Sequence, residues 1–139
     1  MTRLRYVADT SVFARLAKPA VAATFAPLAA ERAVALCAPV AFELGYAART
    51  PGDYRALMDR LASFPAVPVT AGDHDRALET QEVLACRSQH RALSLVDALV
   101  AAVAEARQLT VLHYDSDFEL LEAVIGLDQE WIVPRGTAD

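Results

Sequence analysis

Five acidic residues of the 139-residue chain stand where they could hold a metal ion: Asp9, Glu43, Asp97, Asp115 and Asp117. Carboxylates within a few ångströms of one another repel, and they do not all stay ionised unless a positive charge lies between them. A divalent cation would supply that charge, and oxygen ligands favour Mg²⁺ or Mn²⁺ over zinc. Such a cation serves phosphoryl transfer and phosphodiester hydrolysis, in which it activates water and stabilises the reacting oxygens.

Asp97 is the most informative of these acids because its segment is otherwise apolar. Residues 94–107 predict a helix that is apolar almost all the way round, which is typical of a helix buried on every side. A lone buried carboxylate costs several kcal/mol unless something compensates it. Ser94 and Asp97 also have the spacing of a capping box. Asp97 therefore either caps the helix or faces a site that holds positive charge, and these two roles are compatible.

Three of the other acids follow predicted strands. Asp9 comes directly after a strand at 4–8, and Asp115 and Asp117 come directly after a strand at 110–114. Each of them also suits a helix cap or a first helical turn, where a carboxylate favours the helix dipole. Taken together, they place acids at the carboxyl ends of two strands, which meet at one edge of a parallel sheet.

Glu43 lies in a predicted helix that begins at Pro39 and runs to about Arg49. Its spacing from Val40 and Ala47 puts all three on one helical face. A solvated glutamate belongs on the opposite face, so the pattern predicts that Glu43 points inward, toward the other acids. The alternative is that this face is misassigned.

Short strands alternate with helices, which predicts an α/β fold: a three-layer α/β/α sandwich with a central, mostly parallel sheet. We expect one domain over residues 1–133 and a loose tail at 134–139. The predicted strands are 4–8, 34–38, 67–69, 110–114 and 130–133. The predicted helices are 12–16, 20–31, 39–49, 54–63 (capped by Asp53), 73–90, 94–107 and 115–124.

The composition excludes some classes of protein. The chain is 55% hydrophobic and 22% charged, which is typical of a globular domain. It shows neither a long apolar span nor a signal peptide, so we expect a cytoplasmic protein without membrane contact. A net charge of −5 argues against binding nucleic acid by bulk positive charge, but a nuclease can bind phosphate through metal ions. Candidate phosphate contacts are Arg15, Lys18, Arg49, Arg87 and Arg91.

Four stretches in this order resemble the PIN-domain ribonucleases, and more narrowly the VapC toxins of bacterial type II toxin–antitoxin modules. They are Asp9-Thr10-Ser11, the helical Glu43, Ser94-Leu95-Val96-Asp97, and the run from Val111 to Phe118. The resemblance covers nearly the whole chain. It implies a homodimer and an antitoxin of the VapB kind that obstructs the site, in a heterotetramer or a larger assembly.

The resemblance also implies Mg²⁺- or Mn²⁺-dependent endoribonuclease activity on RNA. Position by position, it implies Asp9, Glu43, Asp97 and Asp115 as catalytic residues, and Asp9, Asp97, Asp115 and Asp117 as metal ligands. His113 departs from the pattern, because many relatives carry Thr or Ser two residues before the fourth acid.

Other functions fit less well. A phosphatase of the haloacid-dehalogenase type needs a second acid where this chain has Ser11, and it needs a late catalytic lysine, whereas Lys18 is the chain's one lysine. A receiver-like phospho-acceptor domain needs paired acids near the N-terminus and a late lysine too. A non-catalytic PIN-like binding or scaffold module is the alternative that stays open.

Overall fold

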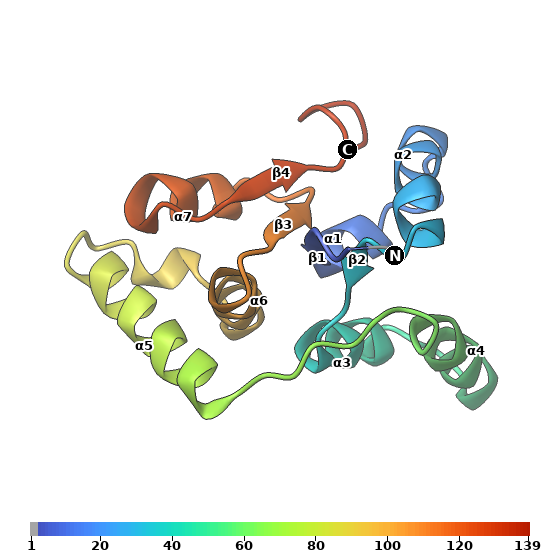
Figure 1. The fold of residues 1–139 in the computed structure, drawn as a ribbon, viewed down its shortest axis with the longest axis horizontal. Helices are drawn as coiled ribbons and strands as arrows, with labels where there is room; N and C mark the ends of the chain where they lie inside the picture. The colour runs from blue at the N-terminus through green and yellow to red at the C-terminus, as the bar shows by residue number, and fades with distance from the viewer. Residues whose placement is uncertain (1–2) are drawn as a thin grey trace.

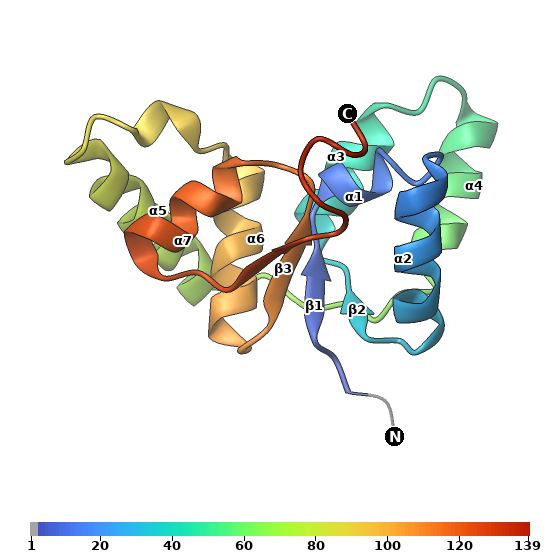
Figure 2. The same ribbon diagram turned by 90° about the horizontal axis from the view of Figure 1, so that it is seen from above.

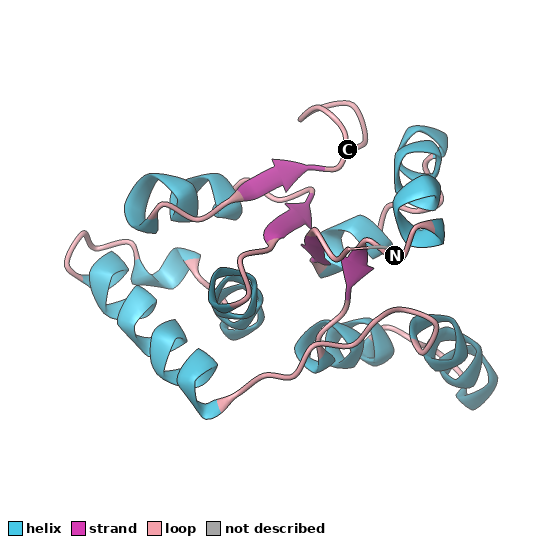
Figure 3. Ribbon diagram, in the orientation of Figure 1, coloured by secondary structure: helices cyan, strands magenta, loops and turns pink. Residues whose placement is uncertain are grey.

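Helices surround four short strands in the computed structural model, which describes residues 3–139 (Figures 1 and 3). The strands are β1 (Tyr6–Ala8), β2 (Val34–Ala35), β3 (Thr110–His113) and β4 (Gln129–Trp131). The helices are α1 (Thr10–Phe13), α2 (Pro19–Ala30), α3 (Ala38–Tyr46), α4 (Pro51–Leu61), α5 (Ala71–Ala85), the 3₁₀ helix η1 (His90–Ala92), α6 (Leu95–Ala106) and α7 (Asp117–Ile125).

The four strands form one sheet in the order β2-β1-β3-β4, and all three pairings are parallel. Val7 of β1 is in register with Ala35 on one side and with Val111 on the other. All strands therefore end at the same edge of the sheet, and Figure 2 shows β1 leading there into α1. This arrangement confirms the predicted α/β class.

Side chains alternate between the two faces of the sheet, as strand geometry requires. Val7 and Val111 contribute to a core cluster with α3, α5, α6 and α7, while Ala8 and Leu112 contribute to a second cluster with α1 and α2. In Figure 1, α2 lies on one side of the sheet, and α5 and α6 lie on the other. The predicted three-layer sandwich is thus confirmed. None of the helices within residues 3–139 is long and apolar enough to cross a membrane.

Two predicted local features are wrong. Residues 67–69 do not form a strand, and only an isolated bridge joins Leu36 to Ala66. Pro65 precedes this stretch and Pro68 lies within it, and proline cannot donate to a strand ladder. The cap of α4 is Thr50 rather than Asp53, because the Thr50 hydroxyl accepts a hydrogen bond from the Asp53 amide at 3.0 Å.

Residues 134–139 are not loose, contrary to the prediction. The Tyr114 hydroxyl accepts hydrogen bonds from the amides of Gly136 (2.8 Å) and Ala138 (2.9 Å), and it donates one to Asp139. Arg15 and Lys18, two of the predicted phosphate contacts, donate to main-chain oxygens of Ala138 and Asp139 and so help to hold this segment. Ala138 is only 2% exposed as a result.

Replacing Tyr114 with phenylalanine is expected to release this segment, because three hydrogen bonds lose their shared oxygen. We expect the free energy of unfolding to fall by about 2 kcal/mol in urea titrations. The amides of Gly136 and Ala138 should exchange with deuterium much faster than in the wild type. The control is Tyr54→Phe, at a half-exposed position. Unchanged protection of both amides in the Tyr114 variant would contradict this role.

Candidate active site

Asp9 follows β1 and caps α1. Its Oδ2 accepts hydrogen bonds from the amide (3.1 Å) and the hydroxyl (2.7 Å) of Ser11. The same hydroxyl oxygen accepts a bond from the Tyr114 amide at 2.8 Å. Ser11 therefore ties the Asp9 carboxylate to the end of β3, so that the acids at the two strand ends are held together.

Asp97 lies in the first turn of α6, where Ser94 is the N-cap. The Ser94 hydroxyl accepts a bond from the Asp97 amide at 3.1 Å. Asp73 is the equivalent acid in α5. Its carboxylate accepts a hydrogen bond from the amide of the N-cap residue Thr70, which completes a capping box. No such return bond from Asp97 occurs in the described part of the chain, so its carboxylate is available to the site.

Asp115 lies two residues beyond the end of β3. Its amide donates to Nδ1 of His113 at 3.0 Å, and its Oδ1 accepts a bond from the Asp117 amide at 3.0 Å. The second of these bonds fixes one carboxylate oxygen at the start of α7. The other carboxylate oxygen is left for interactions with the neighbouring acids.

These three aspartates come together at the carboxyl edge of the sheet. Asp9, Asp97 and Asp115 each offer one oxygen, and the three oxygens lie within 4.8 Å of one another. Asp9 is only 3% exposed, whereas Asp97 and Asp115 are partly exposed. Three separate elements, β1, α6 and β3, thus position one carboxylate cluster that is open to solvent on one side.

Burial and mutual repulsion make this cluster hold a proton. Burial, followed by the charges of Asp9 and Asp115, raises the pKa of Asp97 to about 7. Burial also raises the pKa of Asp9, although its bonds from Ser11 act in the opposite direction. Full ionisation of the three carboxylates near neutral pH therefore calls for a compensating positive charge.

The cluster fits a divalent cation. Oδ1 of Asp9 is buried and has no hydrogen-bond partner within residues 3–139. Oγ1 of the next residue, Thr10, is also buried without a partner among these residues. A buried acceptor without a partner is costly, and a bound cation would remove that cost by coordinating it. The donor set consists of carboxylate oxygens, which suits Mg²⁺ or Mn²⁺.

Asp117 and Glu43 lie outside the close trio. Burial and the charges of Asp115 and Asp9 raise the pKa of Asp117, so Asp117 is within electrostatic reach of the cluster. Glu43 is exposed on α3 and is not one of the three clustered acids, and its orientation toward them stays a prediction. Val40 of the same helix is buried, whereas Phe42 and Tyr46 are 82% and 89% exposed.

Two residues that position the acids were not among the predicted site residues. Ser11 could have been found, because a hydroxyl two residues after an aspartate at a strand end is typical of a local side-chain turn. The contact of His113 with the Asp115 amide could not have been predicted from the sequence, since it depends on how the ring packs between β4 and α7.

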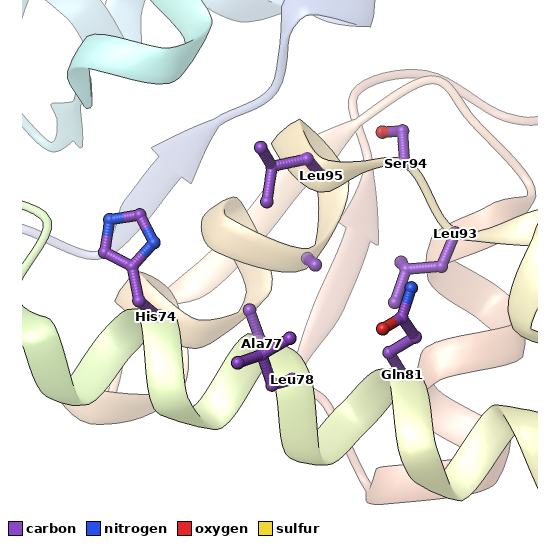
Figure 4. Close-up of a pocket in the computed structure, with 8 residues that line it drawn as sticks. His74, Ala77, Leu78, Gln81, Leu93, Ser94 and Leu95 are labelled. Carbon is purple, nitrogen blue, oxygen red and sulfur yellow. The ribbon is translucent and has the colours of Figure 1, made fainter.

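A separate pocket of about 230 Å³ lies between α5 and α6 (Figure 4). Leu78, Leu93 and Leu95 give it an apolar lining, and Ser94 lies at its edge. None of the three clustered aspartates lines it. The carboxylate cluster therefore does not belong to this cavity.

The sheet topology and the carboxylate cluster are those of a PIN domain. The family model for the PIN domain matches residues 6–123, and the chain belongs to this family. Within the family it belongs with the VapC ribonucleases. It is 46% identical over 136 residues to "Ribonuclease VapC51" of Mycobacterium tuberculosis strain H37Rv, and the match covers 98% of each chain.

Solved structures agree with this assignment. A structure of VapBC2 from Rickettsia felis, bound to a DNA fragment from its promoter, superposes with a TM-score of 0.75 at 16% identity. The match covers 92% of this chain and 98% of that chain, and it shows the shared fold. VapBC-5 from Mycobacterium tuberculosis is 26% identical with a TM-score of 0.66, over 94% of this chain and 98% of that chain.

Proposed function

We propose that the chain is the toxin of a type II toxin–antitoxin system and acts as a metal-dependent endoribonuclease. Its family membership and its relatives named as ribonucleases support the reaction class. The observation that carries the proposal is the trio of Asp9, Asp97 and Asp115 oxygens within 4.8 Å. We assign the metal as Mg²⁺ or Mn²⁺ from the carboxylate ligands.

Each residue of the site has a definite task in RNA hydrolysis. The cation, when bound, supplies water activation and neutralises charge on the phosphodiester. Asp9, Asp97 and Asp115 hold it, and Asp97 must release the proton that its raised pKa retains. Ser11 orients the Asp9 carboxylate and the Asp117 amide orients that of Asp115.

Asp117 and Glu43 take outer positions in this proposal. Asp117 is charge-coupled to Asp9 and Asp115, so we assign it to the metal site directly or through water. Glu43 is exposed on α3, a helix that packs against α6 and α1. Its catalytic role stays a prediction from the resemblance, with contact to the site through water or substrate.

The proposed partners are an antitoxin of the VapB kind and a second copy of the chain. The solved relatives from Rickettsia felis and Mycobacterium tuberculosis are VapBC proteins. A cavity of about 450 Å³ lies between α1, α3 and α4, lined by Phe13, Leu16, Leu44 and Leu57 among others. We assign this apolar cavity to a segment of the antitoxin. We also propose the cytoplasm as the location of the protein, because its proposed substrate is RNA.

Purified chain, free of antitoxin, should cut total cellular RNA into a few discrete fragments when Mg²⁺ or Mn²⁺ is present. Chelator should stop the reaction, and mapping of the fragment ends would identify the target. If the folded protein binds Mn²⁺ but cuts no RNA from a matched bacterial source, the non-catalytic binding module is favoured instead. Thermal melting with increasing Mn²⁺ provides the binding measurement.

A further inference from the structure

We propose that His113 is a positioning residue for the carboxylate cluster: its Nδ1 holds the main chain of Asp115, and Gln129 and Glu122 fix the ring for this task. The inference rests on the proposed function, because it concerns the same site. It assigns a role to His113, a residue to which the resemblance gives none.

The hydrogen bonds at His113 define one tautomer. The Asp115 amide can only donate, so Nδ1, at 3.0 Å, must present a lone pair. The proton of the neutral ring is then on Nε2, which donates to Oε1 of Gln129. The Gln129 amide group in turn donates to Glu122 of α7 at 3.0 Å. The chain of bonds therefore runs in one direction, from the Asp115 amide to the surface of α7.

The ring has no room to turn. His113 is 0% exposed, and its centroid lies 4.9 Å from that of Phe118 and 5.0 Å from that of Trp131. Its backbone carbonyl accepts a bond from the Ile132 amide at 2.8 Å, next to β4. Close packing of this kind transmits position, because a displaced ring would have to displace its neighbours. The core thus fixes the direction of the Asp115 amide.

The consequence for the site follows from the two bonds of Asp115. Nδ1 of His113 fixes its amide and the Asp117 amide fixes its Oδ1, so the remaining oxygen can face Asp9 and Asp97. Without the acceptor at residue 113, the Asp115 amide loses its partner and the turn can relax. Groups that orient metal ligands change metal affinity or activity by about 10–100-fold when they are removed.

Two substitutions of His113 separate the effect of its hydrogen-bond acceptor from the effect of its aromatic ring. His113→Phe keeps an aromatic ring in the stack but removes the acceptor. His113→Asn removes the ring but places Oδ1 where Nδ1 stands, as in side-chain turns in which asparagine accepts from the amide two residues on. A third variant, Gln129→Met, keeps the side-chain length and removes the support of Nε2.

The experiment measures Mn²⁺ binding by calorimetry on metal-stripped protein, together with the kcat and KM for RNA. We expect His113→Phe to weaken Mn²⁺ binding by about 10–100-fold and to lower kcat with little change in KM. His113→Asn should recover most of this loss, and Gln129→Met should lie between the wild type and His113→Phe. In the metal-free wild type, nitrogen-15 spectra of the ring should show the neutral tautomer with its proton on Nε2.

Wild-type Mn²⁺ affinity in folded His113→Phe would overturn the inference. So would equal losses in the Phe and Asn variants, because that pattern means that the ring matters only for packing. If His113→Phe does not fold, normal Mn²⁺ binding by Gln129→Met or a ring proton on Nδ1 would overturn it. Failure of the proposed function is distinguishable, since the wild type itself would then cut no RNA, whereas the comparison of Mn²⁺ affinities among the variants would still test the role of His113.

Discussion

Asp97→Asn is expected to abolish RNA cleavage while making the metal-free protein more stable at pH 8. An amide carries no negative charge, so it cannot replace a carboxylate opposite a divalent cation. A loss of about 4 kcal/mol of transition-state stabilisation lowers the rate by roughly 10³-fold. The amide also removes a charge whose burial, together with repulsion from Asp9 and Asp115, raises the pKa of Asp97 to about 7. The acid that the reaction needs is therefore one that destabilises the empty site.

The substitution should leave the fold intact, because the Ser94 hydroxyl accepts its capping bond from the backbone amide of residue 97, which asparagine keeps. A matched control is Asp59→Asn, at an exposed position of α4. Single-turnover cleavage with Mg²⁺ and urea unfolding with chelator are the two measurements. Cleavage at the wild-type rate by Asp97→Asn would refute the assignment of this residue to the site.

In the absence of metal, the free energy of unfolding of the wild type is expected to fall as the pH rises from about 4 to about 7. The folded protein keeps a proton on Asp97 in this range, whereas the unfolded chain, with a pKa near 3.8, has lost it. Stability falls with pH wherever the folded state binds more protons than the unfolded state. Above pH 7 the carboxylate is ionised in both states, and the loss is complete.

Adding Mn²⁺ should reverse this loss, since the cation binds the ionised carboxylates of the folded state. At a concentration 100 times the dissociation constant, the stabilisation is about 2.7 kcal/mol, or on the order of 10 °C in Tm. The measurement is urea unfolding at pH 5 and pH 8, each with chelator and with Mn²⁺. Asp97→Asn should show a weaker dependence on both pH and metal. Parallel curves for the two proteins would show that another group is responsible.

The sequence could predict most of the site because parallel strands end together. Asp9 and Asp115 each follow an apolar strand, and such strands share one carboxyl edge. Asp97 was predictable from its apolar helix. For Glu43 the helical period defines a face but not how deeply it is buried, and the structure leaves this residue exposed and outside the trio. Val40 is buried, while Ala47 on the same face is exposed.

Contacts between distant residues set the limit of sequence analysis. The segment 134–139 is polar and reads as a tail, but the single hydroxyl of Tyr114 holds it. The contacts of His113 with Gln129, Phe118 and Trp131 likewise depend on the neighbouring strand and helix. The alternation of strands and helices predicted the layers correctly, but it could not predict which side chains meet between them.

The bond from the Tyr114 amide to the Ser11 hydroxyl also has a consequence for protein synthesis. It joins residues that are 103 positions apart, and the carboxylate cluster that it supports needs both β1 and β3. A ribosome makes Asp9 early and Asp115 late. A nascent or truncated chain that lacks β3 therefore cannot assemble the cluster, however well its first helices fold. The producing cell meets an intact site only after synthesis has passed β3 and Asp115.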